Sequence, residues 1–235
     1  MKRIPLILAL GLFFAANAFA HNGALTFMPT VPDPTAMTMD GTEDDWDWYD
    51  RTFAVTPEEI GSWFGEHVEQ GGNPNPTDWS GSYFIAWSPP PDNRFWFFAR
   101  VFDDTLRAAE GENKGAWWND DVVQLSIDGD HSGGGYLANE VAEDINNGYR
   151  IQQHPLFSDE FGVDIGGGAL PPEGEWGGDP EWIDFGGTIL PADADHLSTN
   201  LEYTYEMALT MFDFYDIFGP EDSVIHTFEP DQVIG

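Results

Sequence analysis

The chain has 235 residues and a formal net charge of −34, from 42 acidic and 8 basic side chains. Nucleic acid and anionic membrane surfaces are excluded as partners, because a protein binds phosphate by neutralising it with Lys and Arg. Disorder is excluded by 10 Trp, 18 Phe and 7 Tyr, since disordered acidic chains are poor in aromatic residues. Cysteine is absent, so the fold is built without disulfides.

Residues 1–20 predict a secretory signal peptide. Lys2 and Arg3 precede an apolar run, and Ala18-Phe19-Ala20 supplies a cleavage site with small residues at its first and third positions. The run, residues 4–16, is shorter than the ~20 residues that a membrane-spanning helix needs. We therefore expect an exported protein, periplasmic or extracellular and without membrane insertion, that begins at His21.

Short apolar or alternating runs separated by turn residues follow from residue 35 onward, which is typical of an all-β domain. Residues 21–34 are Pro-rich and predict a flexible lead-in. Residues 94–103 are apolar on both faces, so we expect that strand to be central and buried on both sides. Helical turns are expected at residues 56–63 and 136–145, and a Gly/Pro loop at residues 166–179. The predicted strands are residues 36–40, 82–87, 94–103, 121–128, 148–154, 183–190 and 200–211.

Two of these strands alternate between apolar and more polar positions, which predicts one core face and one polar face for each. The core positions are Val123, Leu125 and Ile127 in the first strand and Tyr203, Tyr205, Met207 and Leu209 in the second. The predicted fold is therefore an antiparallel, jelly-roll-like β-sandwich over residues 35–235. Residues 230–235 look like a turn followed by the start of another strand, so we expect the domain to be missing its C-terminal strand or strands.

The run Asp128-Gly129-Asp130-His131-Ser132-Gly133 matches the opening of calcium-binding loops. Oxygen ligands recur at alternate positions, and Gly at the sixth position allows a sharp turn. An EF-hand needs Glu at the twelfth position and a preceding helix, whereas this run has Asn139 there and follows a predicted strand. The sequence therefore predicts a structural calcium loop with Asp128, Asp130 and Ser132 as ligands; the alternative is a polar turn.

A second group of residues has the composition of a sugar-binding surface. With Leu125 and Ile151 in the core, alternation places polar side chains of two strands opposite the core, and a Trp precedes the first strand. Aromatic faces stack on sugar rings while planar polar groups bond to the hydroxyls. The alternative is that the Trp residues belong to the core and the polar groups are ordinary surface. The predicted carbohydrate-binding residues are Trp117, Trp118, Gln124, Arg150, Gln152 and His154.

Nothing in the sequence indicates a catalytic nucleophile, since it contains no Cys, no G-x-S-x-G turn and no H-E-x-x-H helix motif. Carboxylates are abundant, but no pair is singled out for glycoside cleavage. A binding role is therefore favoured over an enzymatic one.

Several segments in their order along the chain resemble the family 9 carbohydrate-binding module and its broader β-sandwich superfamily. The resemblance covers residues from about 35 to the end, and Trp176 and Trp182 are candidates for a second sugar-stacking aromatic. The matching segments are Asp40-Gly41 with Asp45-Trp46, Phe84-Ile85-Ala86-Trp87, Phe97 to Asp104, Trp118 to Asp128, Tyr149-Arg150-Ile151-Gln152 and Tyr203 to Leu209.

The resemblance implies a calcium-containing sandwich that binds a polysaccharide or oligosaccharide as an accessory to secreted glycoside hydrolases. Gln124 stands where family members commonly carry Glu. The sequence leaves two alternatives to a sugar-binding function. Related sandwiches bind haem b through Met and His ligands, and a purely structural surface domain needs only the sandwich and its acidity.

Overall fold

The structure, a computed structural model, describes residues 26–56, 75, 77–106, 122–131, 151–157, 162–163, 176, 179–194, 197–214, 216 and 219–234. Over these residues the chain is mostly β. Its strands are β1 (Trp79–Trp87), β2 (Phe95–Thr105), β3 (Val122–Asp128), β4 (Ile151–Phe157), β5 (Gly162–Val163), β6 (Ile183–Leu190), β7 (Thr199–Leu209), β8 (Phe212–Phe214) and β9 (Val224–Ile225). Short 3-10 helices are η1 (Pro34–Ala36), η2 (Asp44–Trp46), η3 (Arg51–Phe53) and η7 (Pro220–Asp222).

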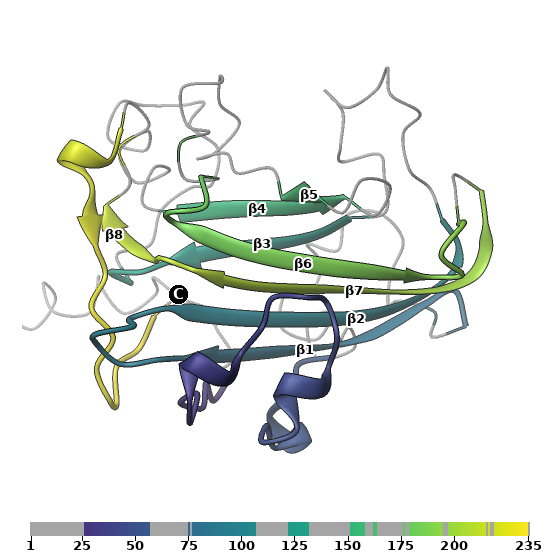
Figure 1. The fold of residues 1–235 in the computed structure, drawn as a ribbon, viewed down its shortest axis with the longest axis horizontal. Coiled ribbons are helices and arrows are strands. Elements are labelled where there is room, and N and C mark those ends of the chain that lie inside the picture. The colour runs from purple at the N-terminus through teal and green to yellow at the C-terminus, as the bar shows by residue number, and fades with distance from the viewer. Residues whose placement is uncertain are drawn as a thin grey trace, which may run out of the picture.

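The largest sheet is antiparallel, with strand order β1-β2-β7-β6 (Figure 1). Strands β3, β4 and β5 form a second sheet, and β8 pairs with β9. Strand β2 lies between β1 and β7, and its residues 95–99 are all buried. The prediction of a central strand that is buried on both sides is therefore confirmed.

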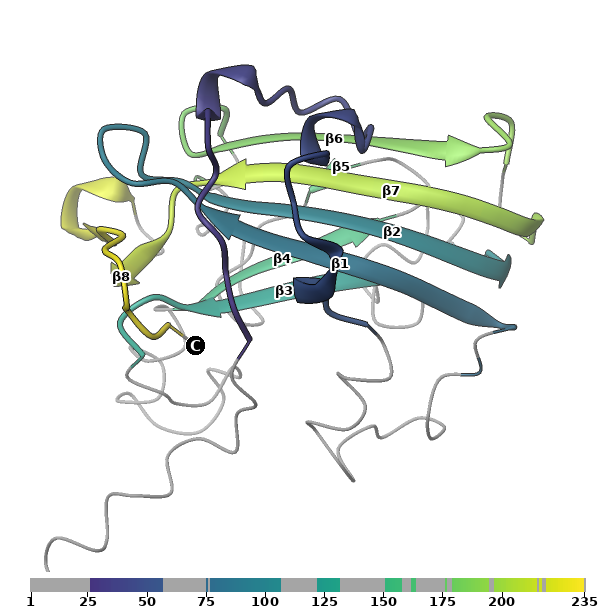
Figure 2. The same ribbon diagram turned by 90° about the horizontal axis from the view of Figure 1, so that it is seen from below.

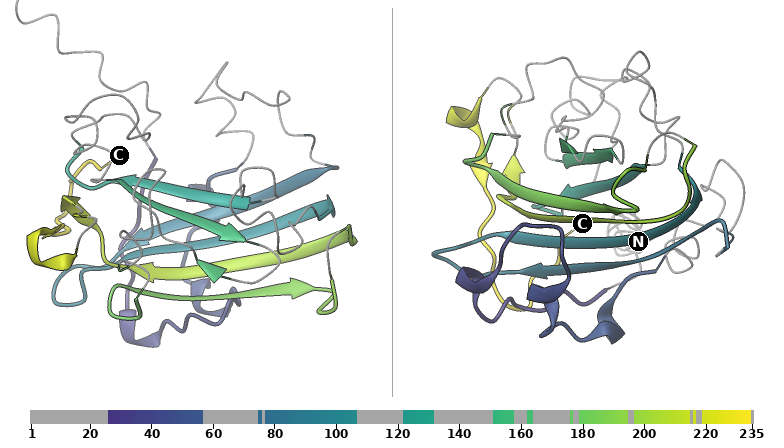
Figure 3. Two further views of the ribbon diagram at one scale, coloured as in Figure 1. Left: turned by 90° about the horizontal axis from the view of Figure 1, so that it is seen from above. Right: turned by 45° about the vertical axis from the view of Figure 1, so that its right-hand side comes forward.

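One face of the four-stranded sheet, which we call the core face, carries the main hydrophobic cluster. Tyr203, Tyr205, Met207 and Leu209 of β7 are all buried there, as predicted. Phe97 of β2 belongs to the same cluster, as does Ile127 of β3. Figure 3 shows β3 and β4 lying over this side of the sheet. Burial of Ile127 in the shared cluster thus joins the β3–β4 sheet to the larger one.

The opposite face, which we call the covered face, differs from the prediction. Thr204, Glu206 and Ala208 were expected on a polar face, but all three are buried. The reason is that residues 26–56 lie across this face (Figure 2) and pack Trp46 and Tyr49 against Phe84, Phe98 and their neighbours. We call residues 26–56 the N-terminal cover. Full burial of a large apolar side chain contributes ~1.5–3 kcal/mol, so the aromatic residues of this cover contribute substantially to the stability of the domain.

The first part of this N-terminal cover differs from the predicted lead-in and strand. Val31 donates its backbone N–H to Trp87 O at 2.8 Å, within the segment expected to be a flexible lead-in. The predicted strand at residues 36–40 is absent: residues 34–36 form η1, whose N-cap is Asp33 and whose first residue is Pro34. A further contact with the edge of β1 is the bridge between Val55 and Tyr83.

Other strand boundaries moved by a few residues. Strand β1 begins at Trp79 rather than at residue 82, and β7 ends at Leu209. Strand β4 (Ile151–Phe157) continues to residue 157 rather than ending at 154, and the predicted residues 148–150 lie outside the described residues. The predicted helical turn at 136–145 and nearly all of 56–63 lie outside the described residues, as does most of the loop at 166–179.

Candidate functional site

The most distinctive polar group in the described part of the chain is the carboxylate of Glu206, in the middle of β7. In the sheet it lies opposite Phe98 on β2 and Gly186 on β6. The residue is 0% exposed. Its Oε1 accepts a hydrogen bond from Trp46 Nε1 at 2.8 Å, and its Oε2 accepts the backbone N–H groups of Gly41 at 3.0 Å and Asp40 at 3.1 Å. One side chain of the sheet therefore holds two points of the N-terminal cover.

Glycines let the cover approach the sheet closely enough to make these bonds. A Cβ added to Gly186 would lie 2.4 Å from Met39 O, and one added to Gly41 would lie 2.6 Å from the backbone of Gly187. Gly41 also has a φ of 78°, in the left-handed region that favours glycine. Thr204 Oγ1 donates to Gly41 O and contacts Thr188 Oγ1 at 2.8 Å. The turn at Gly41 is thus held through both its N–H and its carbonyl.

Burial raises the pKa of Glu206 to about 7, against an ordinary value of 4.5. The hydrogen bonds from Trp46, Gly41 and Asp40 lower this pKa, because they favour the ionised carboxylate, and the charge of Asp40 raises it further. Desolvation prevails, so Glu206 titrates near neutrality.

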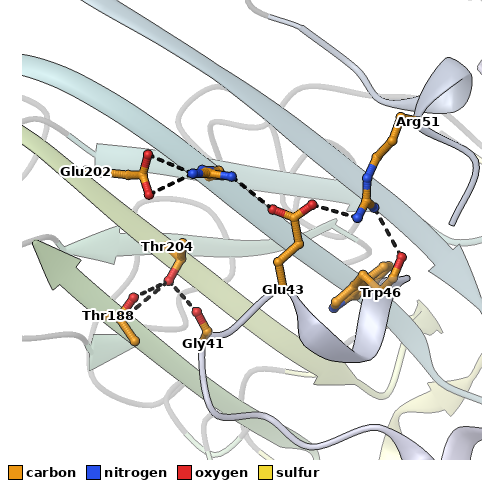
Figure 4. Close-up of polar contacts among 8 residues, drawn as sticks. Gly41, Glu43, Trp46, Arg51, Thr188, Glu202 and Thr204 are labelled. Atoms are coloured by element: carbon orange, nitrogen blue, oxygen red, sulfur yellow. Dashed lines mark hydrogen bonds and ion pairs between the residues drawn. The ribbon is translucent and has the colours of Figure 1, made fainter. Parts of the chain in front are cut away.

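Figure 4 shows a chain of ion pairs that runs from Glu202 through Glu43 to Arg51. Arg100 of β2 contacts both carboxylate oxygens of Glu202 at 3.0 Å and Glu43 at 3.3 Å. Glu43 in turn contacts Arg51 at 2.6 Å, and Arg51 donates to Trp46 O at 3.2 Å. The Arg100 and Arg51 side chains are 50% and 43% exposed. Exposed pairs contribute ~0–1 kcal/mol each, so this chain orients the cover more than it stabilises it.

The geometry defines a docking site for the protein's own N-terminal segment rather than a substrate site. The carboxylate is fully buried and already accepts three hydrogen bonds, so the cover separates it from a substrate in solvent, while the remaining lone pair of Oε1 can take up a proton. Its chemistry is limited to binding the cover and exchanging a proton as the pH changes.

The predicted sugar-binding residues are only partly within the described chain. Trp117, Trp118 and Arg150 lie outside it. Gln124 is on β3 and pairs with Pro155, whereas Gln152 and His154 of β4 pair with Ile127 and Leu125. Directly paired residues of an antiparallel ladder share a face. The expectation that Gln124 shares a face with Gln152 and His154 is therefore wrong, because the register pairs Gln152 and His154 with Ile127 and Leu125, the predicted core positions of β3.

Trp176 and Trp182 do not form two parallel walls around a ligand. Their rings meet edge to face, with centroids 5.5 Å apart and planes at 83°, and both contact Phe212. Trp176 Nε1 donates to Asp216 O at 2.8 Å. These residues form an aromatic corner where the start of β6 meets β8.

The predicted calcium loop is partly described. Asp128 ends β3, Asp130 is exposed in the following turn, and His131 has a φ of 52°; Ser132 lies outside the described residues. Among the residues that the structure describes, no group of three His, Cys, Asp or Glu side chains is arranged to hold a metal ion.

The alternative of haem ligation can be examined at His226, which is buried. Its Nδ1 contacts Asp213 Oδ1, and its Nε2 contacts Gln232 Oε1 at 3.1 Å. Met211 is also buried, in the main hydrophobic cluster. Both imidazole nitrogens are thus occupied within the fold, and no observation at His226 favours a haem iron.

Comparisons with known proteins add no family: no protein-family model, curated protein or solved structure matches the chain. None of the helices in the described ranges is long and apolar enough to cross a membrane.

Sequence reasoning missed the role of Glu206, although a signal was present. Glu206 stands between Tyr205 and Met207 in a strand that is otherwise apolar or uncharged from residue 203 to 209. A charge within such a strand is costly to bury unless it is hydrogen-bonded. That rule predicts a hydrogen-bond donor for the buried carboxylate. The donor is Trp46, 160 positions away in the sequence.

Proposed function

We propose that the protein is an exported, non-catalytic carbohydrate-binding module with a jelly-roll-like β-sandwich fold. The finding that best supports the sandwich is the shared hydrophobic cluster, in which Ile127 of β3 packs with Phe97 and Met207 of the four-stranded sheet. In this proposal the core lies between the two sheets, and the other face of β3–β4 is free to carry a ligand site. The ordered motifs that resemble the family 9 module support the sugar-binding role.

The proposed sugar site is built around Gln124. The register places Gln124, Ser126 and Gln153 on one face of β3–β4 and Leu125 and Ile127 on the other. The face with the amides offers planar groups that both donate and accept hydrogen bonds to hydroxyls. Trp117 or Trp118 supplies the stacking surface, as the sequence predicts, and Gln153 supplies the further donors in place of Arg150. The proposed partner is a polysaccharide or oligosaccharide, with calcium as a structural ion at Asp128, Asp130 and Ser132.

A glycan array probed with the purified mature protein, with and without a chelator, tests this function. Saturable binding to a defined class of glycans is expected, and a blank array would refute the proposal. The absorption spectrum of the same sample serves as a second readout, because a Soret band would assign the domain to haem binding instead.

Matched variants test the site. Gln124→Ala and Gln153→Ala are expected to weaken binding at least tenfold with little loss of stability, as for surface substitutions. Gln152→Ala is the control on the opposite face of the same sheet and is expected to bind normally. Full-strength binding by Gln124→Ala, or a selective loss in Gln152→Ala, would move the site to the other face.

A further inference from the structure

The contacts between the N-terminal cover and the four-stranded sheet converge on one titratable group. Residues 40–46, which we call the strap, donate three hydrogen bonds to Glu206: two from backbone N–H groups at Asp40 and Gly41 and one from the Trp46 indole. The strap also places Trp46 on the aromatic surface of the sheet, with ring centroids 5.9 Å from Phe84 and 6.0 Å from Phe98. Releasing the strap therefore uncovers both Glu206 and this aromatic surface.

The charged groups around Glu206 are mostly acidic. The strap contributes Asp40, Glu43, Asp44 and Asp45, and the same face of β7 carries Glu202. On that face Asp184 of β6 pairs with Ala208, two residues beyond Glu206. Strand β2 contributes the cation Arg100, but its guanidinium is already paired with Glu202 and Glu43. Desolvation and like charge both oppose an ionised Glu206, whereas the three N–H donors favour it.

We propose that the strap is a pH-dependent latch, which docks most firmly while Glu206 carries a proton and loosens when that proton is lost. In the docked state the carboxyl is buried beneath the strap and near the charge of Asp40; in the released state water solvates it. Ionisation of the carboxyl therefore stabilises the released state relative to the docked state. This device is independent of any carbohydrate bound at β3–β4.

The pH window follows from the folded and ordinary pKa values of this carboxyl. A group whose pKa is raised in the docked state contributes its full stabilisation below the ordinary value and loses it as the pH rises through the docked-state value. Here these values are 4.5 and about 7. Each pKa unit corresponds to a tenfold change in an equilibrium, so the docking equilibrium falls by up to about 300-fold across this window.

Amide hydrogen exchange measures the latch directly, because the Gly41 N–H is exposed to solvent only when the strap leaves Glu206. The Gly41 protection factor, corrected for intrinsic exchange and referred to Ala99 in the buried centre of β2, is measured from pH 5 to pH 8.5. We expect it to fall by about 70-fold over this range. Protection that stays constant or rises with pH would overturn the proposal.

Three variants distinguish the latch from a general loss of protection throughout the fold at alkaline pH. Glu206→Gln removes the ionisation, so Gly41 protection is expected to lose its pH dependence; retained dependence would overturn the proposal. Asp40→Asn removes a charge that raises the docked-state pKa of Glu206, so the loss of protection should be smaller and should level off at a lower pH. An unchanged size and end point of the loss would overturn the proposal even if Glu206→Gln fails to fold. Glu202 is a more exposed carboxylate on the same strand and serves as the control. The Glu202→Gln variant should therefore retain the largest part of the pH response of Gly41 protection.

Discussion

Replacing Trp46 by Phe tests whether the hydrogen bond to Glu206 holds the N-terminal cover on the sheet. The substitution removes the Nε1 donor, which lies 2.8 Å from Glu206 Oε1, and leaves an aromatic ring in a site that is 0% exposed. A hydrogen bond to a charged group contributes ~1.5–3 kcal/mol. The smaller ring adds about 1 kcal/mol through imperfect packing. The expected loss of unfolding free energy is about 2.5–4 kcal/mol at pH 8, where Glu206 is mostly ionised.

Trp48→Phe is the matched control, because it makes the same chemical change two residues away. Trp48 stacks on Trp46 with centroids 5.7 Å apart, but its buried Nε1 has no hydrogen-bond partner among the described residues. Removing an unsatisfied donor releases a desolvation penalty, which offsets the lost packing. Trp48→Phe is therefore expected to change stability by about 1 kcal/mol or less.

Urea unfolding followed by far-ultraviolet circular dichroism gives both free energies. The gap between the two variants should be about 2 kcal/mol at pH 8 and should narrow at pH 5, because a hydrogen bond to a neutral carboxyl contributes only ~0.5–1.5 kcal/mol. Equal losses in the two variants at pH 8 would show that the hydrogen bond from Trp46 to Glu206 does not hold the cover, since packing alone would then explain both.

Three further predictions concern the cover and the proposed calcium loop. Gly186→Ala is expected to lower stability by ~1–3 kcal/mol, because its Cβ would lie 2.4 Å from Met39 O; an unchanged melting temperature would show that the cover moves aside freely. Arg100→Met should lower the unfolding free energy by about 1 kcal/mol or less in low salt and by nothing measurable in 1 M NaCl; a loss that persists in high salt would indicate packing instead. A chelator should lower the melting temperature, by an amount equivalent to ~2.7 kcal/mol if calcium was present at 100 times its dissociation constant; a wild-type protein that does not respond, or an equal response in Asp130→Asn, would remove calcium from this loop.

Local sequence pattern predicted the central part of the fold well. Strand β6 was predicted at the residues where it lies, and the buried position of β2 followed from its two apolar faces. The core face of β7 followed from the alternation of Tyr203, Tyr205 and Met207 with smaller or polar residues. These features depend on side chains within one strand, so they can be read from a short window.

The other face of β7 could not be predicted in this way. Alternation shows that the two faces of a strand differ in polarity. It does not show whether a distant segment of the chain covers the more polar face. Glu206 and Thr204 are polar and yet buried, because residues 26–56 return to the sheet and supply Trp46 and the N–H groups near Gly41. That contact joins residues more than 150 positions apart in the sequence.

The prediction of which residues form the sugar-binding face depended on the pairing register of β3 and β4. A displacement by an odd number of residues moves every side chain of a strand to the opposite face. The register pairs Gln152 with Ile127 of the hydrophobic cluster, so Gln152 lies on the face opposite Gln124. Pro155 and His154 lie within β4, and neither gives a clear signal for its register.

Titration of the isotope-labelled mature protein with a glycan selected on the array, followed by NMR, tests the proposed function and its site together. The account predicts saturable shifts at Gln124 and its neighbours on β3, with the indole signal of Trp117 or Trp118, while the Gly41 and Trp46 signals of the strap stay in place. A protein that shows no saturable shift with any glycan on the array, or whose shifts gather at Gly41 and Trp46 alone, would contradict it.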